Sequence, residues 1–374
     1  MKRILVVLGT RPEAIKLAPV IHALRSRSGD FETRVCLTAQ HRELVDRMLD
    51  FFGIVPDVDL DLMRAQQAPG ELAARVLTGM QGVLTDWGPD WVVVQGDTTT
   101  AMAAAMAAFY QGIRVAHVEA GLRTHDLLNP FPEEMNRQVI ARLATLHFAP
   151  TVGARENLMA EGIHPATIRV TGNSGIDALK MALARLDGCR DAELEQMRAL
   201  TADKKYILVT CHRRENFGAG VAALTGALKA LVAEHNVEVI FPVHPNPAVS
   251  EPVYRELSGI PGLHLTGAVG YPAFLWLMKR AALILTDSGG IQEEAPTLQK
   301  RVVLMRKVTE REEAVSPGWV TLTPVESGAI TSACLKILGE APEKGSAGDG
   351  TNPFGDGKAA QRIVEGLLEY PERD

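Results

Sequence analysis

Residues 1–20, MKRILVVLGTRPEAIKLAPV, contain the pattern from which the fold of the whole chain can be predicted. The unbroken aliphatic run at 4–8 is typical of a parallel strand that is buried on both faces. Gly9 ends the run, and Pro12 can occupy the first turn of a helix because its missing N–H would be unpaired there. We therefore predict a strand over 2–8 that is followed directly by a helix.

The same strand-and-helix unit recurs along most of the chain. Short aliphatic runs alternate with longer helical patterns, which indicates βαβ units and parallel sheets. The predicted strands are 2–8, 33–38, 91–95, 113–117, 146–149 and 168–171, then 206–210, 238–242, 262–265, 282–286, 302–305 and 320–322. Two sheets of about six strands favour two Rossmann-like domains. They would join near residues 172–175, and a last helix is predicted over 358–370.

Composition narrows the class of protein. The 374 residues are 46% apolar and 22% charged, so the chain can bury a large core and two domains of ordinary size are expected. A net charge of −6 without a Lys/Arg block argues against a nucleic-acid partner. The four cysteines lie far apart, which fits a reducing compartment. With no signal-peptide pattern and no apolar run of about 18–20 residues, we expect a cytoplasmic protein without a membrane partner.

Three carboxylates follow predicted strands or begin a helix in the first half of the chain. They are Asp97, Glu119 and Glu133, and they come from separate loops. In open α/β sheets ligands bind beyond the carboxyl ends of the strands, and neighbouring carboxylates can act as acid and base there. Two structural alternatives stay open: Asp97 also fits an N-cap of the Ala-rich helix, and Glu133 a first-turn helix residue.

Positive charge and titratable groups follow the strands of the second half. His212 stands beside Arg213 and Arg214, and guanidinium groups suit a diphosphate. The alternative is a surface ion-pair cluster with Glu215.

A Ser-Gly-Gly turn at 288–290 follows the strand predicted at 282–286. Glycines let backbone N–H groups approach an anion at the start of a helix, and Glu294 one turn later could accept protons from ribose hydroxyls. An ordinary capped helix with an acidic face explains the same residues.

Several familiar site patterns do not occur in the sequence. There is no HExxH and no closely spaced histidine pair, so we expect His117, His125, His212 and His244 to be polar site or structural residues and not metal ligands. No P-loop occurs, and no GxGxxG follows the first strand, so ATP hydrolysis and dinucleotide redox chemistry lose their usual signals.

Longer blocks in a fixed order resemble those of the non-hydrolysing UDP-N-acetylglucosamine 2-epimerases. They are GTRPEAIK (9–16), TAQHR (38–42), GDTTT (96–100), HVEAGLR (117–123), PEE (132–134) with Asn136 and Arg137, HRREN (212–216) and DSGGIQEEAP (287–296). The order holds from the first strand to NPFG at 352–355, so the resemblance covers nearly the whole chain.

The resemblance implies a fold and a reaction. The family has the GT-B architecture, an α/β fold of two Rossmann-like domains whose parallel sheets face an interdomain cleft. The domains would be 1–172 with 357–374, whose last helix crosses back, and a UDP-binding domain at 173–356. The reaction interconverts UDP-GlcNAc and UDP-ManNAc for surface polysaccharide, with no NAD or other cofactor and no obligatory metal. We further expect a UDP-sugar substrate as the partner, and a homodimer.

The resemblance also assigns residues to the site. The acid and base groups fall on Asp97, Glu119 and Glu133, with His212 beside the sugar and the diphosphate. Substrate-binding positions fall on Arg11, Lys16, Arg137, Arg213, His244, Phe274, Ser288, Gly289, Gly290, Glu294 and Arg311. Bacterial relatives can bind a second UDP-GlcNAc as an activator, through groups that resemble Gln40, Arg214 and His244.

Some blocks depart from the family pattern, and other functions stay open. TEREE at 309–313 lacks the usual proline, QKR replaces Gly-Lys-Pro at 299–301, and YPAF at 271–274 rearranges Tyr-Leu-Pro-Phe. The alternatives are a hydrolysing 2-epimerase that releases UDP and ManNAc, a GT-B glycosyltransferase and a non-catalytic UDP-sugar sensor. Three carboxylates disfavour the last two, because transfer or binding needs no proton exchange at carbon 2. The TRPE run at 10–13 favours the reversible epimerase over the hydrolysing one.

Overall fold

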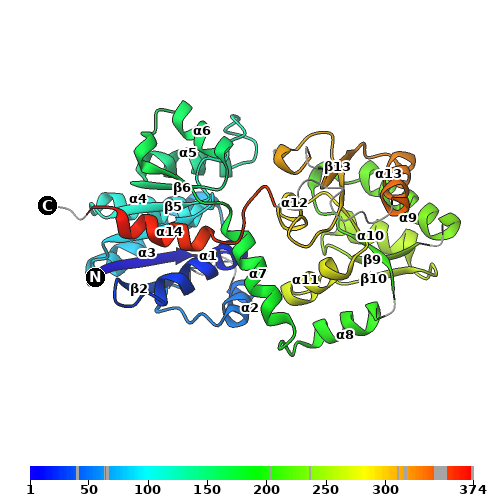
Figure 1. Ribbon diagram of the computed structural model, residues 1–374, viewed down its shortest axis with the longest axis horizontal. Helices are drawn as coiled ribbons and strands as arrows, with labels where there is room; N and C mark the ends of the chain where they lie inside the picture. The colour runs from blue at the N-terminus through cyan, green and yellow to red at the C-terminus, as the bar shows by residue number, and fades with distance from the viewer. Residues whose placement is uncertain are drawn as a thin grey trace. The chain divides into compact units, whose positions relative to one another are not determined.

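The chain forms two compact units in a computed structural model. The first is Met1–Met181 with Phe354–Asp374, and the second is Ala182–Pro353 (Figure 1). The structure describes residues 1–38, 42–62, 64, 67–202, 204–235, 237–309, 311–315, 318–340 and 352–371, with the side chains of 42–44 and 312 excepted. Each unit is a parallel β-sheet with helices packed on it, as the alternating pattern predicts.

The sheet of the first unit has seven parallel strands in the order β3-β2-β1-β4-β5-β6-β7. The strands are β1 (Lys2–Leu8), β2 (Phe31–Leu37), β3 (Val58–Asp59), β4 (Trp91–Gln95), β5 (Arg114–Val118), β6 (Leu146–Ala149) and β7 (Ile168–Val170). All six predicted strands are present. The seventh strand, β3, is not predicted, because a segment of two residues is too short to show an alternating or β-branched pattern. Strand order reverses between β1 and β4, so the loops after these two strands diverge and leave a crevice at their carboxyl ends.

The second sheet has six parallel strands in the order β10-β9-β8-β11-β12-β13. They are β8 (Tyr206–Val209), β9 (Glu238–Pro242), β10 (Leu263–Thr266), β11 (Leu283–Thr286), β12 (Val302–Met305) and β13 (Val320–Thr323). All six predictions are confirmed, with boundaries that move by one residue at most. The reversal here lies between β8 and β11.

Helices connect the strands. In the first unit they are α1 (Arg11–Arg25), α2 (Arg42–Phe52), α3 (Pro69–Trp87), α4 (Thr99–Tyr110), α5 (Glu133–Leu143), α6 (Val152–Ala160), η1 (Pro165–Thr167) and α14 (Ala359–Glu369). Helix α7 (Ser174–Leu186) runs from the first unit into the second. The second unit adds α8 (Ala192–Thr201), η2 (Arg214–Asn216), α9 (Ala219–His235), α10 (Pro247–Leu257), α11 (Tyr271–Arg280), α12 (Gly289–Glu294), η3 (Glu312–Ala314) and α13 (Ser327–Gly339).

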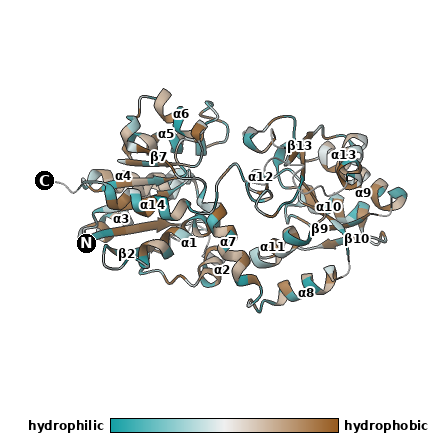
Figure 2. Ribbon diagram, in the orientation of Figure 1, coloured by the Kyte–Doolittle hydropathy of each residue, from teal (hydrophilic) through white to brown (hydrophobic). Residues whose placement is uncertain are grey.

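Hydrophobic burial holds each sheet between its helices. Strand β1 is hydrophobic along almost its whole length in Figure 2, and its residues 4–8 are buried. Leu5 and Val7 pack with Val92 and Val94 of β4 in a cluster that includes residues of α3 and α4. Each such side chain contributes about 1.5–3 kcal/mol when it is fully buried. The strand ends that carry the polar residues are therefore fixed to a rigid layer.

Helix α14 belongs to the first unit although it lies at the far end of the sequence. It packs against α1, beside which it runs in Figure 1. The Lys2 ammonium donates to the backbone oxygens of Leu367 (2.9 Å), Leu368 (2.8 Å) and Tyr370 (2.7 Å), so it satisfies carbonyls at the C-terminal end of α14.

The start of α7 also stays with the first unit, whereas the sequence assigned residues from 173 onward to the second domain. Asn173 N–H donates to Phe354 O at 2.7 Å. The buried Asp177 carboxylate accepts from the backbone N–H groups of Ala359 (3.2 Å) and Ala360 (2.9 Å), at the first turn of α14. These bonds tie the beginning of α7 to the returning chain.

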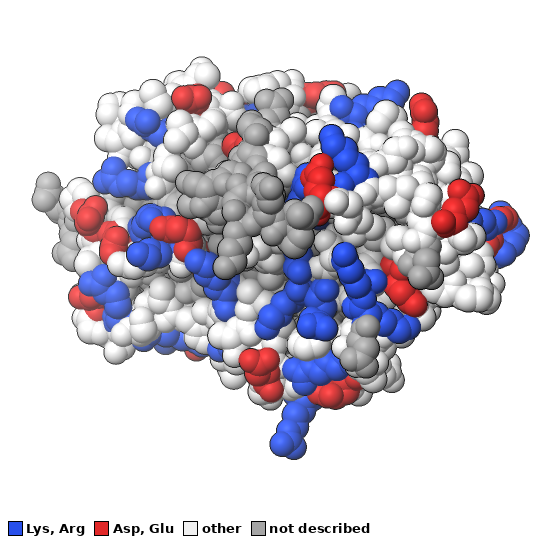
Figure 3. All heavy atoms as spheres, turned by 45° about the vertical axis from the view of Figure 1, so that its right-hand side comes forward, with Lys and Arg blue, Asp and Glu red and all other residues white. Residues whose placement is uncertain are grey.

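Charged side chains of both signs lie on the face drawn in Figure 3, where acidic groups border the basic ones. Exposed pairs such as Lys229–Glu256 (2.8 Å) and Arg198–Glu195 (2.7 Å) belong to the second unit. Pairs of this kind contribute little to stability, because water screens them. Within the described part of the chain, no helix is long and apolar enough to cross a bilayer.

Candidate active site

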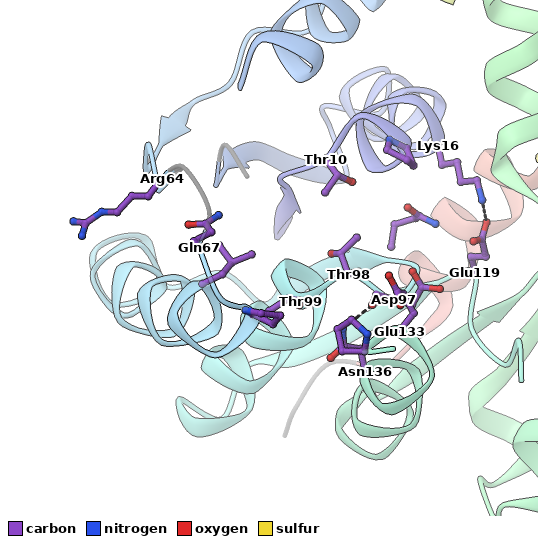
Figure 4. A pocket seen from close by; sticks show the side chains of 15 residues that line it. Thr10, Lys16, Arg64, Gln67, Asp97, Thr98, Thr99, Glu119, Glu133 and Asn136 are labelled. Carbon is purple, nitrogen blue, oxygen red and sulfur yellow. Dashed lines mark hydrogen bonds and ion pairs between the residues drawn. The ribbon is translucent and has the colours of Figure 1, made fainter. Parts of the chain in front are cut away.

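A pocket of about 740 Å³ opens in the first unit where strand order reverses. Its lining comes from the loops after β1, β4 and β5, from the first turns of α1 and α5, and from the region before and at the start of α3. The lining residues are Thr10, Pro12, Lys16, Arg64, Gln67, Pro69, Leu72, Gln95, Asp97, Thr98, Thr99, Glu119, Pro132, Glu133 and Asn136. Figure 4 shows Asp97, Glu119 and Glu133 grouped at one end, while Arg64 lies at the opposite end.

Asp97 follows β4 but does not cap α4, so the N-cap alternative for this residue is wrong. The cap is Thr98, whose Oγ1 accepts from Ala101 N–H at 2.9 Å. The Asp97 carboxylate instead pairs with the Arg137 guanidinium, with Nη2 to Oδ2 at 2.7 Å. Asn136 donates its side-chain N–H to Asp97 O at 2.8 Å. Two residues of α5 therefore fix the position of Asp97.

Glu119 follows β5 in a left-handed backbone conformation, with φ of 64°. Its carboxylate forms an ion pair with Lys16 of α1 across the pocket (Figure 4). Gly121 has φ of 91°, and a Cβ there would lie 2.1 Å from Ala154 O, so only glycine fits this turn. The tight turn aims the Glu119 side chain into the pocket.

Glu133 is the first residue of α5 and lines the same pocket. Within the described residues its carboxylate has no hydrogen-bond or ion-pair partner, whereas Asp97 and Glu119 each have a cation. Glu133 thus lies in the first turn of α5, as the structural alternative has it, but it also lines the pocket.

His117 of β5 supports this site from the core. It is fully buried, and its Nε2 lies 2.7 Å from Gly96 O, which makes Nε2 the protonated nitrogen. Burial lowers the pKa of His117 to about 3, although the bond to Gly96 acts in the opposite direction. The ring is thus a neutral donor that holds the peptide before Asp97, which is the structural one of the two roles expected for this histidine.

The polar residues of the second unit gather around Asp287, directly after β11. Its buried carboxylate accepts from His212 Nδ1 (2.9 Å), Arg213 N–H (2.9 Å) and Asn216 Nδ2 (3.0 Å). Burial raises the pKa of Asp287, but these hydrogen bonds and the His212 charge outweigh it, so its pKa is about 2. Because Nδ1 of His212 faces Asp287, Nε2 is the nitrogen that remains for a ligand.

The glycine turn after β11 begins the short helix α12. Gly289 is buried against Arg311, since a Cβ at Gly289 would lie 2.9 Å from the guanidinium carbon. The same guanidinium donates from Nε to Glu293 at 2.7 Å. Ser288 does not cap the helix with its side chain, and its own N–H donates to Thr286 Oγ1 at 2.9 Å.

The other predicted residues divide between the two units. In the second, His244 is exposed with its ring 6.3 Å from that of His212, Arg214 is exposed, Gly290 is exposed, and Phe274 and Glu294 are half-buried. In the first, Arg11 is half-buried at the start of α1. Gln40 lies outside the described residues. No cluster of potential metal ligands occurs in the described part of the chain.

Three further residues, Asn136, Asp287 and Glu13, have structural roles at the site that are not predicted from the sequence. Asn136 holds the Asp97 backbone, Asp287 orients His212, and Glu13 accepts four hydrogen bonds beside the pocket. A signal was present for Asp287, because it directly follows a predicted strand. No local signal marks which donors will surround a buried carboxylate.

Comparison with known proteins decides the family. The family model described as UDP-N-acetylglucosamine 2-epimerase matches residues 22–368. The chain belongs to this family. It is 49% identical to UDP-N-acetylglucosamine 2-epimerase of Salmonella typhimurium, over 98% of this chain and 99% of that one. The corresponding enzyme of Escherichia coli K12 is 46% identical, over 98% of both chains.

Solved structures of 2-epimerases agree with this assignment. That of Neisseria meningitidis UDP-GlcNAc 2-epimerase bound to UDP-GlcNAc has a TM-score of 0.88 and 42% identity, over 98% of this chain and 100% of that one. The Methanocaldococcus jannaschii enzyme, in complex with UDP-GlcNAc and UDP, has a TM-score of 0.82 and 33% identity, over 98% and 99%. The expected fold class, two parallel-sheet α/β domains of GT-B type, is confirmed, and this 2-epimerase is an enzyme of the isomerase class.

Proposed function

We propose that the chain interconverts UDP-GlcNAc and UDP-ManNAc reversibly and without net hydrolysis. The observation that carries the proposal is the group of three carboxylates, Asp97, Glu119 and Glu133, at one end of a single pocket. Inversion at carbon 2 needs one group that removes a proton and another that returns it to the opposite face. A pocket that only binds a UDP-sugar, or that only transfers its sugar, would need no pair of groups to exchange a proton at carbon 2.

The reaction begins with an elimination. The hydrogen on carbon 2 is not acidic until the bond from carbon 1 to the UDP oxygen breaks and carbon 1 gains oxocarbenium character. In the α-linked GlcNAc sugar the UDP oxygen on carbon 1 and the hydrogen on carbon 2 are both axial. Anti elimination therefore gives 2-acetamidoglucal and UDP. One carboxylate takes the proton. A second then protonates carbon 2 from the other face while the UDP oxygen attacks carbon 1 again, which forms UDP-ManNAc.

The second unit supplies groups suited to the departing diphosphate. We assign this role to Arg213, Arg311, the Ser288 hydroxyl and the backbone N–H groups of Gly289 and Gly290, because guanidinium groups and hydrogen-bond donors stabilise developing negative charge. His212, held by Asp287 through Nδ1, presents Nε2 for a phosphate or sugar oxygen. Lys16, Arg11, Phe274 and Glu294 stay assigned to substrate binding. Arg137 is assigned there too, although its guanidinium already contacts Asp97 and Glu134.

The role in the cell follows from the product. A nucleotide-activated ManNAc is a donor for surface polysaccharide, and UDP-sugars of this kind are made in the cytoplasm, where we place the enzyme as a homodimer. Activation by a second UDP-GlcNAc through Arg214 and His244 also belongs to the proposal. Analytical ultracentrifugation measures the oligomeric state, and a substrate-saturation curve measures activation by a second UDP-GlcNAc.

Incubation with UDP-GlcNAc in deuterated water, followed by proton NMR, tests the reaction. We expect UDP-ManNAc with deuterium at carbon 2, and deuterium in the recovered UDP-GlcNAc as well. Accumulation of UDP and free ManNAc would indicate the hydrolysing reaction instead. A protein that neither exchanges this hydrogen nor turns over substrate would contradict the proposal.

Neutral variants of the carboxylates test their assignment. Asp97→Asn and Glu133→Gln should each lower kcat by about 10²–10⁴-fold, because a proton-transfer group is lost. UDP should still bind to both variants. Glu156→Gln, which changes an exposed carboxylate of α6, is the matched control and should keep full activity. Full activity of Asp97→Asn or Glu133→Gln would remove that residue from the acid–base set.

A further inference from the structure

Glu13 is a fully buried carboxylate that the proposed reaction does not use. Its Oε2 accepts from Gly9 N–H (2.9 Å), Thr10 N–H (2.7 Å) and the Thr10 hydroxyl (2.8 Å). Its Oε1 accepts from the Thr98 hydroxyl at 2.6 Å. These donors come from the loops after β1 and after β4, so one carboxylate joins the two strand ends between which the sheet order reverses.

The bond to Thr98 has a defined direction. The Thr98 hydroxyl donates its hydrogen to Glu13, because an ionised carboxylate can only accept, and its oxygen accepts from Ala101 N–H at 2.9 Å as the N-cap of α4. Thr98 follows Asp97 directly in the chain, and both line the pocket. Glu13 therefore holds the peptide that carries Asp97.

The same helix also holds the second carboxylate of the site. Glu13 and Lys16 are three residues apart on α1, so they lie on neighbouring positions of one helix face. Lys16 forms the ion pair with Glu119, which follows β5. One face of α1 thus contacts the loops after β4 and β5, and each of these loops carries one of the pocket carboxylates.

Burial of this carboxylate is costly unless donors surround it. Burial raises the pKa of Glu13, and the bonds from Thr98, Gly9 and Thr10 act against that rise. An apolar side chain would avoid the cost but would leave two backbone N–H groups and two hydroxyls without this acceptor. What the carboxylate adds is a fixed separation between the two loops.

We propose that Glu13 is a positioning residue that sets the spacing of Asp97 and Glu119, since it holds Thr98 while Lys16 on the same face of α1 holds Glu119. The inference rests on the proposed function, in which both carboxylates handle protons. A misplacement of about 1 Å at such groups can cost about 10²-fold in rate.

Glu13→Gln tests the proposal, because the amide keeps the size of the side chain but has only one acceptor oxygen for two loops. We expect kcat to fall about 10–100-fold while KM for UDP-GlcNAc stays within about twofold. Thr98→Val should lower kcat in the same way, because it removes the hydroxyl. Thr98→Ser has a hydroxyl and should keep the wild-type kcat. The double variant Glu13→Gln/Thr98→Val should be no slower than the slower single variant, because both remove one interaction.

Thr151→Val is the matched control. Thr151 caps α6 through its hydroxyl, which accepts from Ala154 N–H at 3.1 Å, and it does not line the pocket. Both Val variants should lower Tm by a few degrees, since each loses an N-cap, but only Thr98→Val should lower kcat. A folded Glu13→Gln enzyme with unchanged kcat, or additive losses in the double variant, would overturn the proposal. If Glu13→Gln does not fold, equal kcat in Thr98→Val and Thr98→Ser overturns it.

Amide hydrogen exchange separates this inference from the proposed function, because it does not depend on turnover. In Glu13→Gln we expect faster exchange in both segments, 9–16 and 96–101, although they are distant in sequence. Acceleration confined to 9–16 would show that Glu13 does not hold the second loop. A wild-type protein with no epimerase activity would contradict the proposed function alone, and the exchange result would still decide whether the link between the loops exists.

Discussion

Buried carboxylates in this protein accept hydrogen bonds from loops that carry site residues. Glu134 accepts from Thr124 N–H (3.0 Å) and pairs with Arg137 (2.9 Å), which in turn holds Asp97. Asp287 does the same for the loop that carries His212. Each of these carboxylates accepts hydrogen bonds that the loop at a strand end would otherwise form with water. It thereby holds the loop in one conformation.

The loop bearing His212 should become less stable when Asp287 is replaced by asparagine. Because the folded pKa of about 2 lies below the ordinary aspartate pKa of 3.8, the carboxylate stabilises the fold fully above about pH 4. This contribution, about 2 kcal/mol, is lost as the pH falls toward 2. Urea denaturation of the wild type and Asp287→Asn should differ most at pH 5–7 and converge at lower pH. A difference that does not depend on pH would contradict this explanation.

At the scale of single elements, helix ends decide where the returning chain binds. Helix α14 has no side-chain cap of its own at Lys358. Asp177 of α7 supplies the cap from a distant part of the sequence, and Lys2 satisfies carbonyls at the other end. The helix is therefore fixed at both ends by the first unit.

Asp177→Ala should release the start of α14. Loss of an N-cap costs about 0.5–2 kcal/mol, so the amides of 359–363 should exchange faster with solvent and Tm should fall by a few degrees. Asp191→Ala is the control, since Asp191 caps α8 in the second unit through Leu194 N–H at 2.8 Å. It should leave exchange in α14 unchanged. Equal exchange of α14 in both variants would exclude the role of Asp177.

At the scale of the molecule, the first unit is built from two separate stretches of chain. Ile363, Val364 and Leu367 of α14 are buried, and Tyr370 packs edge-to-face against Trp91 with ring centroids 5.1 Å apart. The second unit is continuous in sequence and has its own core around β8, β9 and β11. The two units therefore differ in how they depend on the C-terminal residues.

A chain that ends after Pro353 should lose stability in the first unit only. Removal of α14 exposes apolar surface on α1 and the ring of Trp91, so unfolding of this unit should move to lower temperature. The second unit should keep its own transition in calorimetry. If both units lose stability equally, or neither does, the division of the core between them is not as described.

Features of this protein that depend on neighbouring residues can be predicted from the sequence, whereas contacts between distant residues cannot. Twelve strands were predicted because buried aliphatic runs are a local signal, while the two-residue β3 has no such signal. The place of Asp97 in the pocket could be predicted because this residue follows a strand. Its supposed capping role was wrong, because Asp97 and Thr98 both have cap-forming side chains and only the backbone geometry decides between them.

The sequence by itself determined the alternation of strands and helices, the position of polar residues at strand ends and the family, since these depend on local periodicity and on ordered blocks. The tertiary structure decided which groups meet: Arg137 with Asp97, Lys16 with Glu119, and Glu13 with Thr98. These pairs join residues that are 40, 103 and 85 positions apart. Only the packing of helices on a parallel sheet brings such residues together, because no local pattern encodes a contact across that distance.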